Sequence, residues 1–359
     1  MSSITVVAPP PDPKQGHDFP PMQYACSIYG LGVLANKPIP TIPFSAIENA
    51  DVHVSFGVLP EWLGSLQPHQ VETTYIADYT NENGKPAFVF AKLHGGDFYR
   101  FSYADDTEFV VDNGGREIWT TWQEPLTLED TATYLLGPVM GFVLLLRGLV
   151  SLHASAIVVD EAAIALVGPA GAGKSTTAAA FSARGFSVLA EDVVTLDDAC
   201  EGREDRTDRF FVRPAYPCIR LWPASAASLF GSRSALPPLT PNWDKCYLDL
   251  TQQSGGFENT PRALRAIYLL GERSDDPNAP LVQPLDQAAG LIELIANTYA
   301  TKLLDKHMRA RQFELLSRVL AQVPLRRVTP HTNAAKIPAL CDLLLGDFSY
   351  WADSARLNV

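Results

Sequence analysis

Short segments in which hydrophobic and polar residues alternate dominate the first third of the chain. Alternation with a period of two is typical of half-buried β-strands. Residue pairs that favour tight turns separate several of the segments, at Asn83-Gly84, Gly95-Gly96 and Asn113-Gly114. The pattern predicts an antiparallel meander or a small sandwich, with strands at residues 53–58, 73–79, 87–93, 98–103, 108–111 and 117–122.

The pattern changes near residue 126. Thr127 followed by Asp130 resembles a capping box, which predicts a helix that continues into the apolar run 134–150. That run is close to the shortest length that spans a membrane but contains Arg147, so we interpret it as a buried core helix. The elements expected next are strands at 155–159 and 163–167, a glycine-rich loop, a helix at 175–184 and a strand at 186–190. This order of elements predicts an α/β domain.

The remaining signals complete the expected organisation. Amphipathic spacing predicts helices at about 286–300 and 305–322 and a last helix at 335–346. The β-rich part has no dense cluster of catalytic residue types, so we interpret it as a recognition or assembly domain. The predicted parts are a flexible, proline-rich N-terminal arm (1–22), the β-rich domain (23–125), an α/β domain (126–346) and a tail (347–359).

Composition excludes several classes of protein. Of the 359 residues 47% are hydrophobic and 19% charged, which is enough apolar material for a core and excludes wholesale disorder. Lys plus Arg number 28 and Asp plus Glu 40, so the net charge is −12. This balance argues against a partner that is nucleic acid or an anionic membrane, although a local pocket for a nucleotide is compatible with it. With no signal-peptide pattern and no CxxC pair, we expect a cytoplasmic protein.

Residues 168–175 read GPAGAGKS and fit the phosphate-binding pattern G-x-x-x-x-G-K-[ST]. Glycines let the backbone curl so that its N–H groups point at phosphate oxygens, and the following helix adds its positive N-terminal end. Lys174 would reach the β- and γ-phosphates, and the Ser175 hydroxyl would ligate Mg²⁺. The residues expected to bind the nucleotide are Gly168, Ala170, Gly171, Ala172, Gly173, Lys174, Ser175 and Thr176.

The nucleotide we expect is ATP. A GTPase reads guanine with an Asn-Lys-x-Asp element after the loop, whereas the similar string at residues 36–39 precedes the loop and lacks the Asp. An ABC-type ATPase carries a Leu-Ser-Gly-Gly-Gln signature, and Ser-Gly-Gly at residues 254–256 lacks that context. Both of these nucleotide classes are therefore set aside.

Glu191 and Asp192 follow a hydrophobic strand, seventeen residues after Lys174. One carboxylate at such a position can hold Mg²⁺, and an adjacent one can accept a proton from an attacking hydroxyl. A solvated pair at a strand end is the alternative, and the distance from the loop favours the functional interpretation. His153 lies fifteen residues before Gly168. It is either a structural histidine or a group that orients one of the carboxylates.

The run LHASAIVVDEAAIALVGPAGAGKSTTAAAFSARGFSVLAEDVVTL (152–196) resembles the catalytic domain of HPr kinase/phosphorylase and its relatives, including the kinases of lasso-peptide clusters. Weaker similarity extends through residues 213–223, 244–250, 264–272, 297–299 and 323–328. The resemblance implies a fold of the α/β class, in which a P-loop kinase domain of the HPr kinase type over residues 126–346 follows a smaller β-rich N-terminal domain.

Roles follow from the resemblance position by position. His153 matches the family histidine upstream of the loop, and two adjacent Asp residues of the family, a general base and a metal ligand, correspond to Glu191 and Asp192. The implied catalytic residues are therefore Glu191 as the base, His153 and Lys174. The implied metal ligands are Ser175 and Asp192. Arg220 and Lys245, in the weakly similar segments, either contact the transferring phosphate or the acceptor or are surface cations.

The sequence also departs from the family. Thr176 stands where the family has Glu, and the family signature with an Arg-Gly-Leu-Gly core is absent, so neither phosphorylase activity nor HPr as the acceptor is implied. What the resemblance implies is an ATP- and Mg²⁺-dependent kinase acting on a serine hydroxyl of a peptide or small protein, a lasso-peptide precursor being one candidate. A small-molecule kinase and a nucleotide-binding regulatory protein with little turnover stay open as alternatives. The sequence also leaves a homo-oligomer open.

Overall fold

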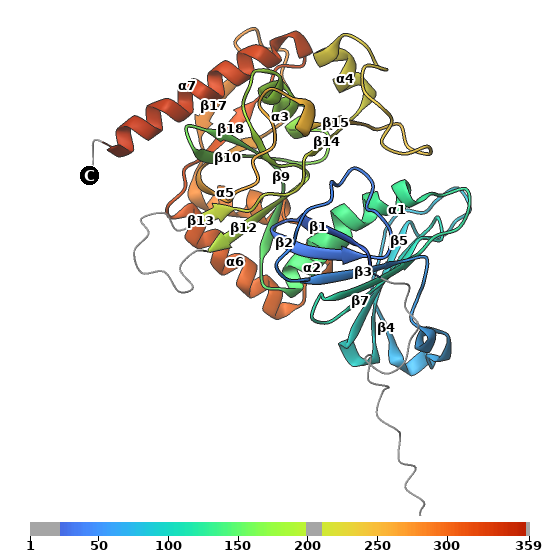
Figure 1. Ribbon diagram of the computed structural model, residues 1–359. Coiled ribbons are helices and arrows are strands. Elements are labelled where there is room, and N and C mark those ends of the chain that lie inside the picture. Colours follow the sequence, from blue (N-terminus) through green and yellow to red (C-terminus); the bar gives the residue numbers. More distant parts are fainter. Residues whose placement is uncertain (1–21, 199–209, 357–359) are drawn as a thin grey trace, which may run out of the picture.

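The computed structural model describes residues 22–198 and 210–356. Apart from Met22, the arm expected at residues 1–22 lies outside this range. The described residues form a mixed α/β structure with two large β-sheets and a small two-stranded sheet. Figure 1 shows the first sheet on one side of the molecule and the second sheet, with most of the helices, on the other.

The first sheet combines a meander with a short N-terminal hairpin. Strands β4 to β8 pair in antiparallel fashion in chain order, as the alternation predicts. Strand β3 joins them parallel to β8, and it also pairs in parallel with β2. The result is one mixed sheet and not a sandwich. Its strands are β1 (Tyr24–Ile28), β2 (Leu31–Ala35), β3 (Val52–Phe56), β4 (Val71–Ile76), β5 (Phe88–Leu93), β6 (Phe98–Tyr103), β7 (Glu108–Asp112) and β8 (Glu117–Thr121).

A broken helix connects the two sheets. It consists of α1 (Leu128–Tyr134), a π-helical turn, η4 (Leu135–Val139), and α2 (Met140–Leu146). The capping box predicted at its start is present, because the Thr127 and Asp130 side chains each bond the backbone N–H of the other. Pro138 lies in the π turn, where it has no N–H to contribute to an α-helical bond. A hydrophobic core runs without interruption from the first sheet across this helix to the second, so the domain boundary near residue 125 stays a prediction.

The connecting helix is also the most apolar helix of the described residues. Within them, Leu128–Leu146 is the one helical run long and apolar enough to cross a membrane. However, 78% of its most apolar window is buried inside the protein. This burial agrees with the core helix expected from the sequence.

The second sheet carries the glycine-rich loop, which follows its strand β10, and the Glu191-Asp192 turn, which lies between its strands β11 and β12. Strand β10 pairs antiparallel with β9 and parallel with β16, and the pairs β9–β12, β12–β13 and β13–β16 complete a closed circuit. The strands of this sheet are β9 (Val150–Val159), β10 (Ala162–Val167), β11 (Val188–Ala190), β12 (Val193–Asp198), β13 (Phe210–Val212), β16 (Arg262–Leu270), β17 (Leu281–Pro284) and β18 (Leu325–Thr329). The separate two-stranded antiparallel sheet is formed by β14 (Cys218–Leu221) and β15 (Cys246–Asp249).

The helices of this half are close to the predicted ones, except for the last and for the helix at Pro223–Phe230, which was not predicted from the sequence. They are α3 (Lys174–Ala183), α4 (Pro223–Phe230), α5 (Gln287–Ala296), α6 (Lys306–Leu320) and α7 (Ile337–Arg356). The prediction that the last helix ends at residue 346 and a tail follows is wrong, because α7 continues to Arg356. Leu344 and Phe348 on the two sides of this predicted end belong to one buried cluster, and Asp347 accepts a hydrogen bond from the Tyr268 hydroxyl at 3.1 Å. The glycine at the predicted end is thus an exposed position inside a packed helix.

Candidate functional site

The glycine-rich loop runs from Gly168 to Gly173 and connects β10 to α3. Gly173 is the N-cap residue of α3 and has a φ of 103°, in the left-handed region that side chains disfavour. A Cβ atom on Gly168 would lie 2.7 Å from the carbonyl oxygen of Leu270 on the neighbouring strand. The path of the loop therefore depends on glycine at both ends.

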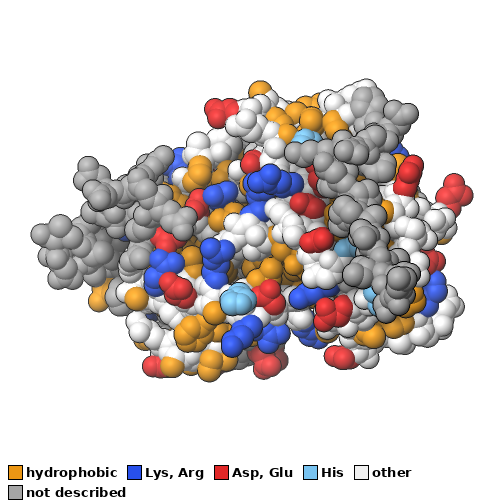
Figure 2. All heavy atoms as spheres, turned by 90° about the horizontal axis from the view of Figure 1, so that it is seen from below, with side chains coloured by type: hydrophobic (Ala, Val, Ile, Leu, Met, Phe, Trp, Pro, Cys, Tyr) orange, Lys and Arg blue, Asp and Glu red, His pale blue; other side chains and the backbone are white. Residues whose placement is uncertain are grey.

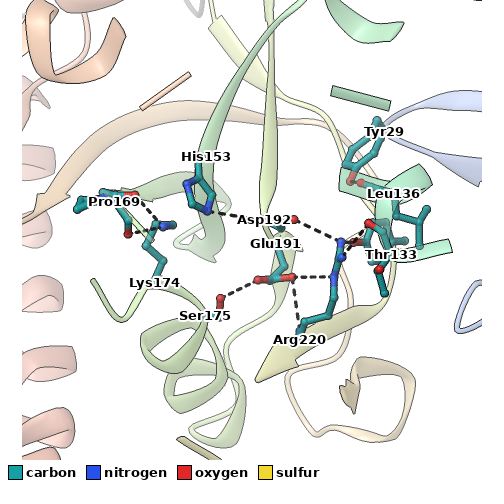
Figure 3. A network of polar contacts seen from close by, with 12 residues as sticks. Tyr29, Thr133, Leu136, His153, Pro169, Lys174, Ser175, Glu191, Asp192 and Arg220 are labelled. Carbon is teal, nitrogen blue, oxygen red and sulfur yellow. Dashed lines mark hydrogen bonds and ion pairs between the residues drawn. The ribbon is translucent and has the colours of Figure 1, made fainter. Parts of the chain in front are cut away.

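Lys174 is folded back into this loop. Its Nζ donates hydrogen bonds to the carbonyl oxygens of Gly168 at 2.7 Å and Pro169 at 3.0 Å, as Figure 3 shows. The side chain is buried, and this burial lowers the pKa of Lys174 to about 8. The ammonium group is thus held against the backbone of the loop by two of its carbonyl oxygens.

Glu191 and Asp192 form the tight turn between β11 and β12. Asp192 has a φ of 66°, which is uncommon for a residue other than glycine. Glu191 accepts a hydrogen bond from the Ser175 hydroxyl at 2.7 Å. The Glu191 side chain is 4% exposed and the Asp192 side chain 24% exposed. The two carboxylates therefore differ in partner and in exposure. Glu191 contacts the start of α3, whereas Asp192 is partly open to solvent.

Arg220 of β14 lies against both carboxylates. Its Nη2 atom is 3.4 Å from Asp192 Oδ2, and its Nε atom is 3.9 Å from Glu191 Oε2. The guanidinium also donates to the Tyr216 hydroxyl and, at 3.5 Å, to the carbonyl of Thr133. Arg220 is buried, so it is not the surface cation that the sequence left as an alternative. It supplies a positive charge that balances the buried carboxylate of Glu191 and the partly exposed carboxylate of Asp192.

Burial and the Asp192 charge raise the pKa of Glu191 above its ordinary value. Burial acts in the same direction on Asp192, but Arg220 and then His153 outweigh it, so the pKa of Asp192 is lowered. Asp192 is therefore the carboxylate of the pair that stays ionised most readily.

His153 approaches the same carboxylate from β9. It lies directly opposite Val193 in the strand register, and its Nε2 is 3.5 Å from Asp192 Oδ1. Burial, followed by the charge of Lys174, lowers the pKa of His153, which keeps the imidazole neutral at pH 7. The Tyr299 ring lies edge-on to the imidazole at 5.7 Å between ring centres. The sequence motifs did not single out Tyr299, although its segment was one of the weakly similar ones.

The other predicted residues surround this centre. The Thr176 hydroxyl points to α4, where it hydrogen-bonds Ser225 at 2.8 Å. The Lys245 ammonium lies over the Trp222 ring, 5.2 Å from its centre, and its charge makes a small contribution at the acidic pair, opposing the rise in the pKa of Glu191 and adding to the fall in the pKa of Asp192. At the tip of the loop Ala170 and Gly171 are exposed and Ala172 is half-buried. The structure thus brings Lys174, Ser175, Glu191, Asp192, His153 and Arg220 together, while Thr176 faces away from the two acids.

Two further residues border the site without any sequence motif to indicate them. Tyr29, in the turn between β1 and β2, is fully buried and donates its hydroxyl hydrogen to the carbonyl of Leu136 in the π turn. Its ring lies edge-on to Tyr216, the residue that accepts from Arg220. On the other side, Arg273 extends across the loop and donates to the carbonyl of Gly171 at 3.3 Å. Both reach the site through contacts between distant segments.

The charge distribution on the surface bears on possible ligands. In Figure 2, on the part of the face not covered in grey, acidic and basic side chains lie interspersed in small groups. A face of this kind lacks the continuous basic stripe that nucleic-acid binding needs. A phosphate ligand would depend instead on oriented loop amides and Lys174.

Comparisons with known proteins give little further guidance. No family model matches the chain, and no curated protein matches it. Among solved structures, the HPr(Ser) kinase/phosphatase from Coxiella burnetii matches 58% of this chain and 97% of its own at 14% identity, with a TM-score of 0.33. A similarity this loose carries no argument about activity, so function has to be argued from the site itself.

Proposed function

We propose that this protein is an ATP- and Mg²⁺-dependent kinase that transfers the γ-phosphate of ATP to a serine hydroxyl of a peptide or small protein. The observation that carries the proposal is the contact between the glycine-rich loop and the acidic pair, made by Ser175 and Glu191 at 2.7 Å. Phosphoryl transfer needs a cradle for the phosphates, oxygen ligands for a metal and a group that orients the acceptor hydroxyl. Residues suited to all three lie around this contact.

Ser175 and Glu191 suit the metal. Their hydroxyl and carboxylate are hard oxygen donors within hydrogen-bonding distance of each other. Mg²⁺ in kinase sites takes one or two such protein oxygens and completes its shell with phosphates and water. In the described part of the chain no cluster of three or more His, Cys, Asp or Glu side chains would hold a metal without such help. When bound, Mg²⁺ would supply charge neutralisation on the transferring phosphate.

Asp192 is the carboxylate that suits the acceptor. Its side chain is 24% exposed, whereas that of Glu191 is 4% exposed, so an incoming hydroxyl can reach Asp192. The sequence-based assignment made Glu191 the base and Asp192 the metal ligand, and these contacts favour the reverse. The raised pKa of Glu191 alone would favour it as the base. However, a buried carboxylate bonded to Ser175 has no open face for an acceptor.

The proposed reaction follows from these positions. The serine oxygen attacks the γ-phosphorus of ATP while Asp192 accepts the proton of that serine hydroxyl. The bond between the γ-phosphorus and the oxygen that bridges it to the β-phosphate breaks, and ADP leaves. The loop amides and Lys174 stabilise the charge on the phosphates. His153 and Arg220 hold Asp192 in position through contacts at 3.5 and 3.4 Å.

A chain-like acceptor fits the surroundings of the site better than a metabolite. Trp222, which is 55% exposed, lies under Lys245, the cation whose charge acts on both carboxylates of the acidic pair. An exposed indole with a cation on it offers a surface for a peptide rather than an enclosed pocket. The net charge of −12 further favours a neutral or basic acceptor segment over an acidic one.

The experiment that tests the function supplies ATP labelled at the γ-phosphate, with Mg²⁺, to the purified protein and to lysate separated at a small-molecule cutoff. We expect label on serine in the peptide and protein fraction, identified by mass spectrometry, and far less label with the Asp192→Asn variant. Label only in the small-molecule fraction would instead identify a small-molecule kinase. Tight ATP binding without transfer to either fraction would identify a nucleotide-binding regulatory protein.

The affinity for ATP is expected to fall as the pH rises through about 8. Without ATP, Lys174 has a pKa of about 8. Bound phosphates would raise the pKa of Lys174, so at a pH above about 8 the binding of ATP is accompanied by the uptake of a proton. Below it Lys174 is protonated in both states and the affinity is constant; above it the affinity falls by up to about tenfold per pH unit. Titration calorimetry in buffers of different ionisation enthalpy measures this proton uptake. Lys174→Arg, which stays charged, should abolish it, and a flat wild-type profile would contradict the assignment.

A further inference from the structure

Tyr299 lies beside the proposed base, and the proposed reaction does not use it. It belongs to a short extended segment, residues 297–299, that follows α5 and pairs with the start of β9. The Tyr299 N–H donates to the carbonyl of Ser151 at 2.9 Å, and the His153 N–H donates to the carbonyl of Asn297 at 2.7 Å. The backbone of Tyr299 is therefore fixed to the strand that carries His153.

Two glycines of the connecting helix make room for the Tyr299 side chain. A Cβ atom on Gly141 of α2 would lie 2.8 Å from Cδ1 of the Tyr299 ring, closer than real Cβ atoms come to other atoms. A Cβ atom on Gly137 of the π turn would lie 3.5 Å from Asp192 Oδ2 and 3.9 Å from the Tyr299 hydroxyl oxygen. The ring therefore lies against Gly141, and its hydroxyl and the Asp192 carboxylate both lie next to Gly137.

The Tyr299 hydroxyl forms a hydrogen bond with the Asp192 side chain. Burial, followed by the charge of Asp192, raises the pKa of Tyr299 well above its ordinary value, so the phenol keeps its proton and is the donor. The carboxylate of Asp192 is thus contacted from three separate elements. These contacts come from Arg220 of β14, from His153 of β9 and from Tyr299 after α5.

The proposed base needs a group that fixes its orientation. A general base works when one of its oxygens lies within hydrogen-bonding reach of the proton that it takes. A misplacement of about 1 Å can lower the rate about 10²-fold. The Asp192 side chain is 24% exposed, so packing alone leaves its carboxylate room to turn. A hydroxyl donor fixes one carboxylate oxygen without adding a second positive charge, which would weaken the base.

We propose that Tyr299 is a positioning residue for phosphoryl transfer, whose hydroxyl orients the Asp192 carboxylate toward the acceptor serine while its ring is seated against Gly141. The inference rests on the proposed function, since it takes Asp192 as the base. It requires that the effect of the Tyr299 hydroxyl on the rate pass through Asp192.

The test is a double-mutant cycle of Tyr299→Phe and Asp192→Asn in the whole protein. The rate measured is the transfer of label from γ-labelled ATP, with Mg²⁺, to the peptide and protein fraction of lysate. We expect Tyr299→Phe to lower kcat about tenfold when Asp192 is present and less than about twofold in the Asp192→Asn background. The KM for ATP should stay within about twofold, because the hydroxyl acts on the carboxylate and not on the glycine-rich loop.

Tyr268→Phe is the matched control. Tyr268 is also buried, and its hydroxyl donates to a carboxylate outside the site, that of Asp347, at 3.1 Å. The control should lower the midpoint of chemical denaturation as Tyr299→Phe does, but leave kcat within about twofold. Gly141→Ala keeps the hydroxyl and adds a Cβ atom where the Tyr299 ring lies, so it should lower kcat as Tyr299→Phe does.

The outcomes separate the inference from the function on which it rests. A normal kcat in Tyr299→Phe, or the same fold loss with and without the Asp192 carboxylate, would overturn the positioning role alone. An equal loss of kcat in Tyr268→Phe would also overturn it, because the loss would then follow from any missing buried tyrosine hydroxyl. If the folded wild type transfers label to no fraction, the proposed function itself has failed, and the role of Tyr299 with it.

Discussion

Replacing Asp192 with asparagine is expected to lower kcat by about 10²- to 10⁴-fold while ATP binding persists. Asparagine keeps the size of the side chain and removes its ability to take the proton of the acceptor hydroxyl. The lowered pKa of Asp192 means that the wild-type carboxylate is ionised at neutral pH, so the loss should appear throughout that range. Single-turnover transfer from labelled ATP, with calorimetric ATP binding on the same samples, measures the effect.

Glu191→Gln is the matched control for this experiment. Glu191 contacts Ser175, and these two residues are the proposed ligands of Mg²⁺. Loss of the Glu191 carboxylate should therefore raise the Mg²⁺ concentration needed for half-maximal rate. Higher Mg²⁺ should therefore restore much of the activity of Glu191→Gln and none of the activity of Asp192→Asn. The opposite result, with Mg²⁺ rescuing Asp192→Asn only, would establish the sequence-based assignment and refute the exchange of roles proposed here.

Replacing Arg220 with methionine is expected to lower the free energy of unfolding by about 3–5 kcal/mol. Arg220 is buried and lies within 3.4 Å of Asp192 and 3.9 Å of Glu191. Methionine has a similar length and is apolar, so the main loss is the charge that balances two adjacent carboxylates. Chemical denaturation followed by far-UV circular dichroism measures the change.

Two comparisons isolate the cause of this instability. In the double variant Arg220→Met/Glu191→Gln one carboxylate has been neutralised, so part of the lost stability should return. Lys85→Met removes an exposed cation that pairs with Asp106 at 2.8 Å, and it should cost at most about 1 kcal/mol. Equal costs for Arg220→Met and Lys85→Met would show that Arg220 does not hold the acidic pair.

Local patterns predicted the parts of the site that are continuous in sequence. The loop from Gly168 to Ser175 follows from a motif whose spacing reflects one strand, one turn and one helix. Glu191 and Asp192 were predictable because they come directly after the hydrophobic strand that follows that helix in the sequence. The helix start at Thr127 was predictable for the same reason, because a capping box is complete within four residues.

The rest of the site depends on pairing between distant segments. Arg220 reaches the acids from the two-stranded sheet β14–β15, and Tyr29 comes from a turn of the first sheet, so no spacing along the chain connects them with the loop. The parallel pairing of β10 with β16 closes the strand circuit across nearly a hundred residues, and alternation within each strand cannot indicate it. Residues that belong to a motif continuous in the sequence were thus predictable, whereas contacts between distant segments were not.

The roles of the acidic pair illustrate this limit. From the sequence, Glu in place of the first Asp is only a carboxylate moved outward by one methylene. In the structure that extra reach is used, because Glu191 accepts the Ser175 hydroxyl while the shorter Asp192 turns toward His153 and Arg220. Which carboxylate meets which neighbour depends on the left-handed backbone at Asp192, a conformation that Asp adopts more readily than most residues but that its residue type does not by itself predict.

The turn that carries Tyr29 limits how such a chain could be recombined during evolution. The ring is fully buried among residues of the other half, with its hydroxyl on Leu136 and its edge on Tyr216. If the first sheet were exchanged for an unrelated module, the loss of the Tyr29 ring would leave a cavity beside Tyr216, the residue that Arg220 contacts. The new module would need a side chain that fills this cavity, or the residues that line the cavity would have to change. The two halves of this chain are therefore expected to have been inherited together.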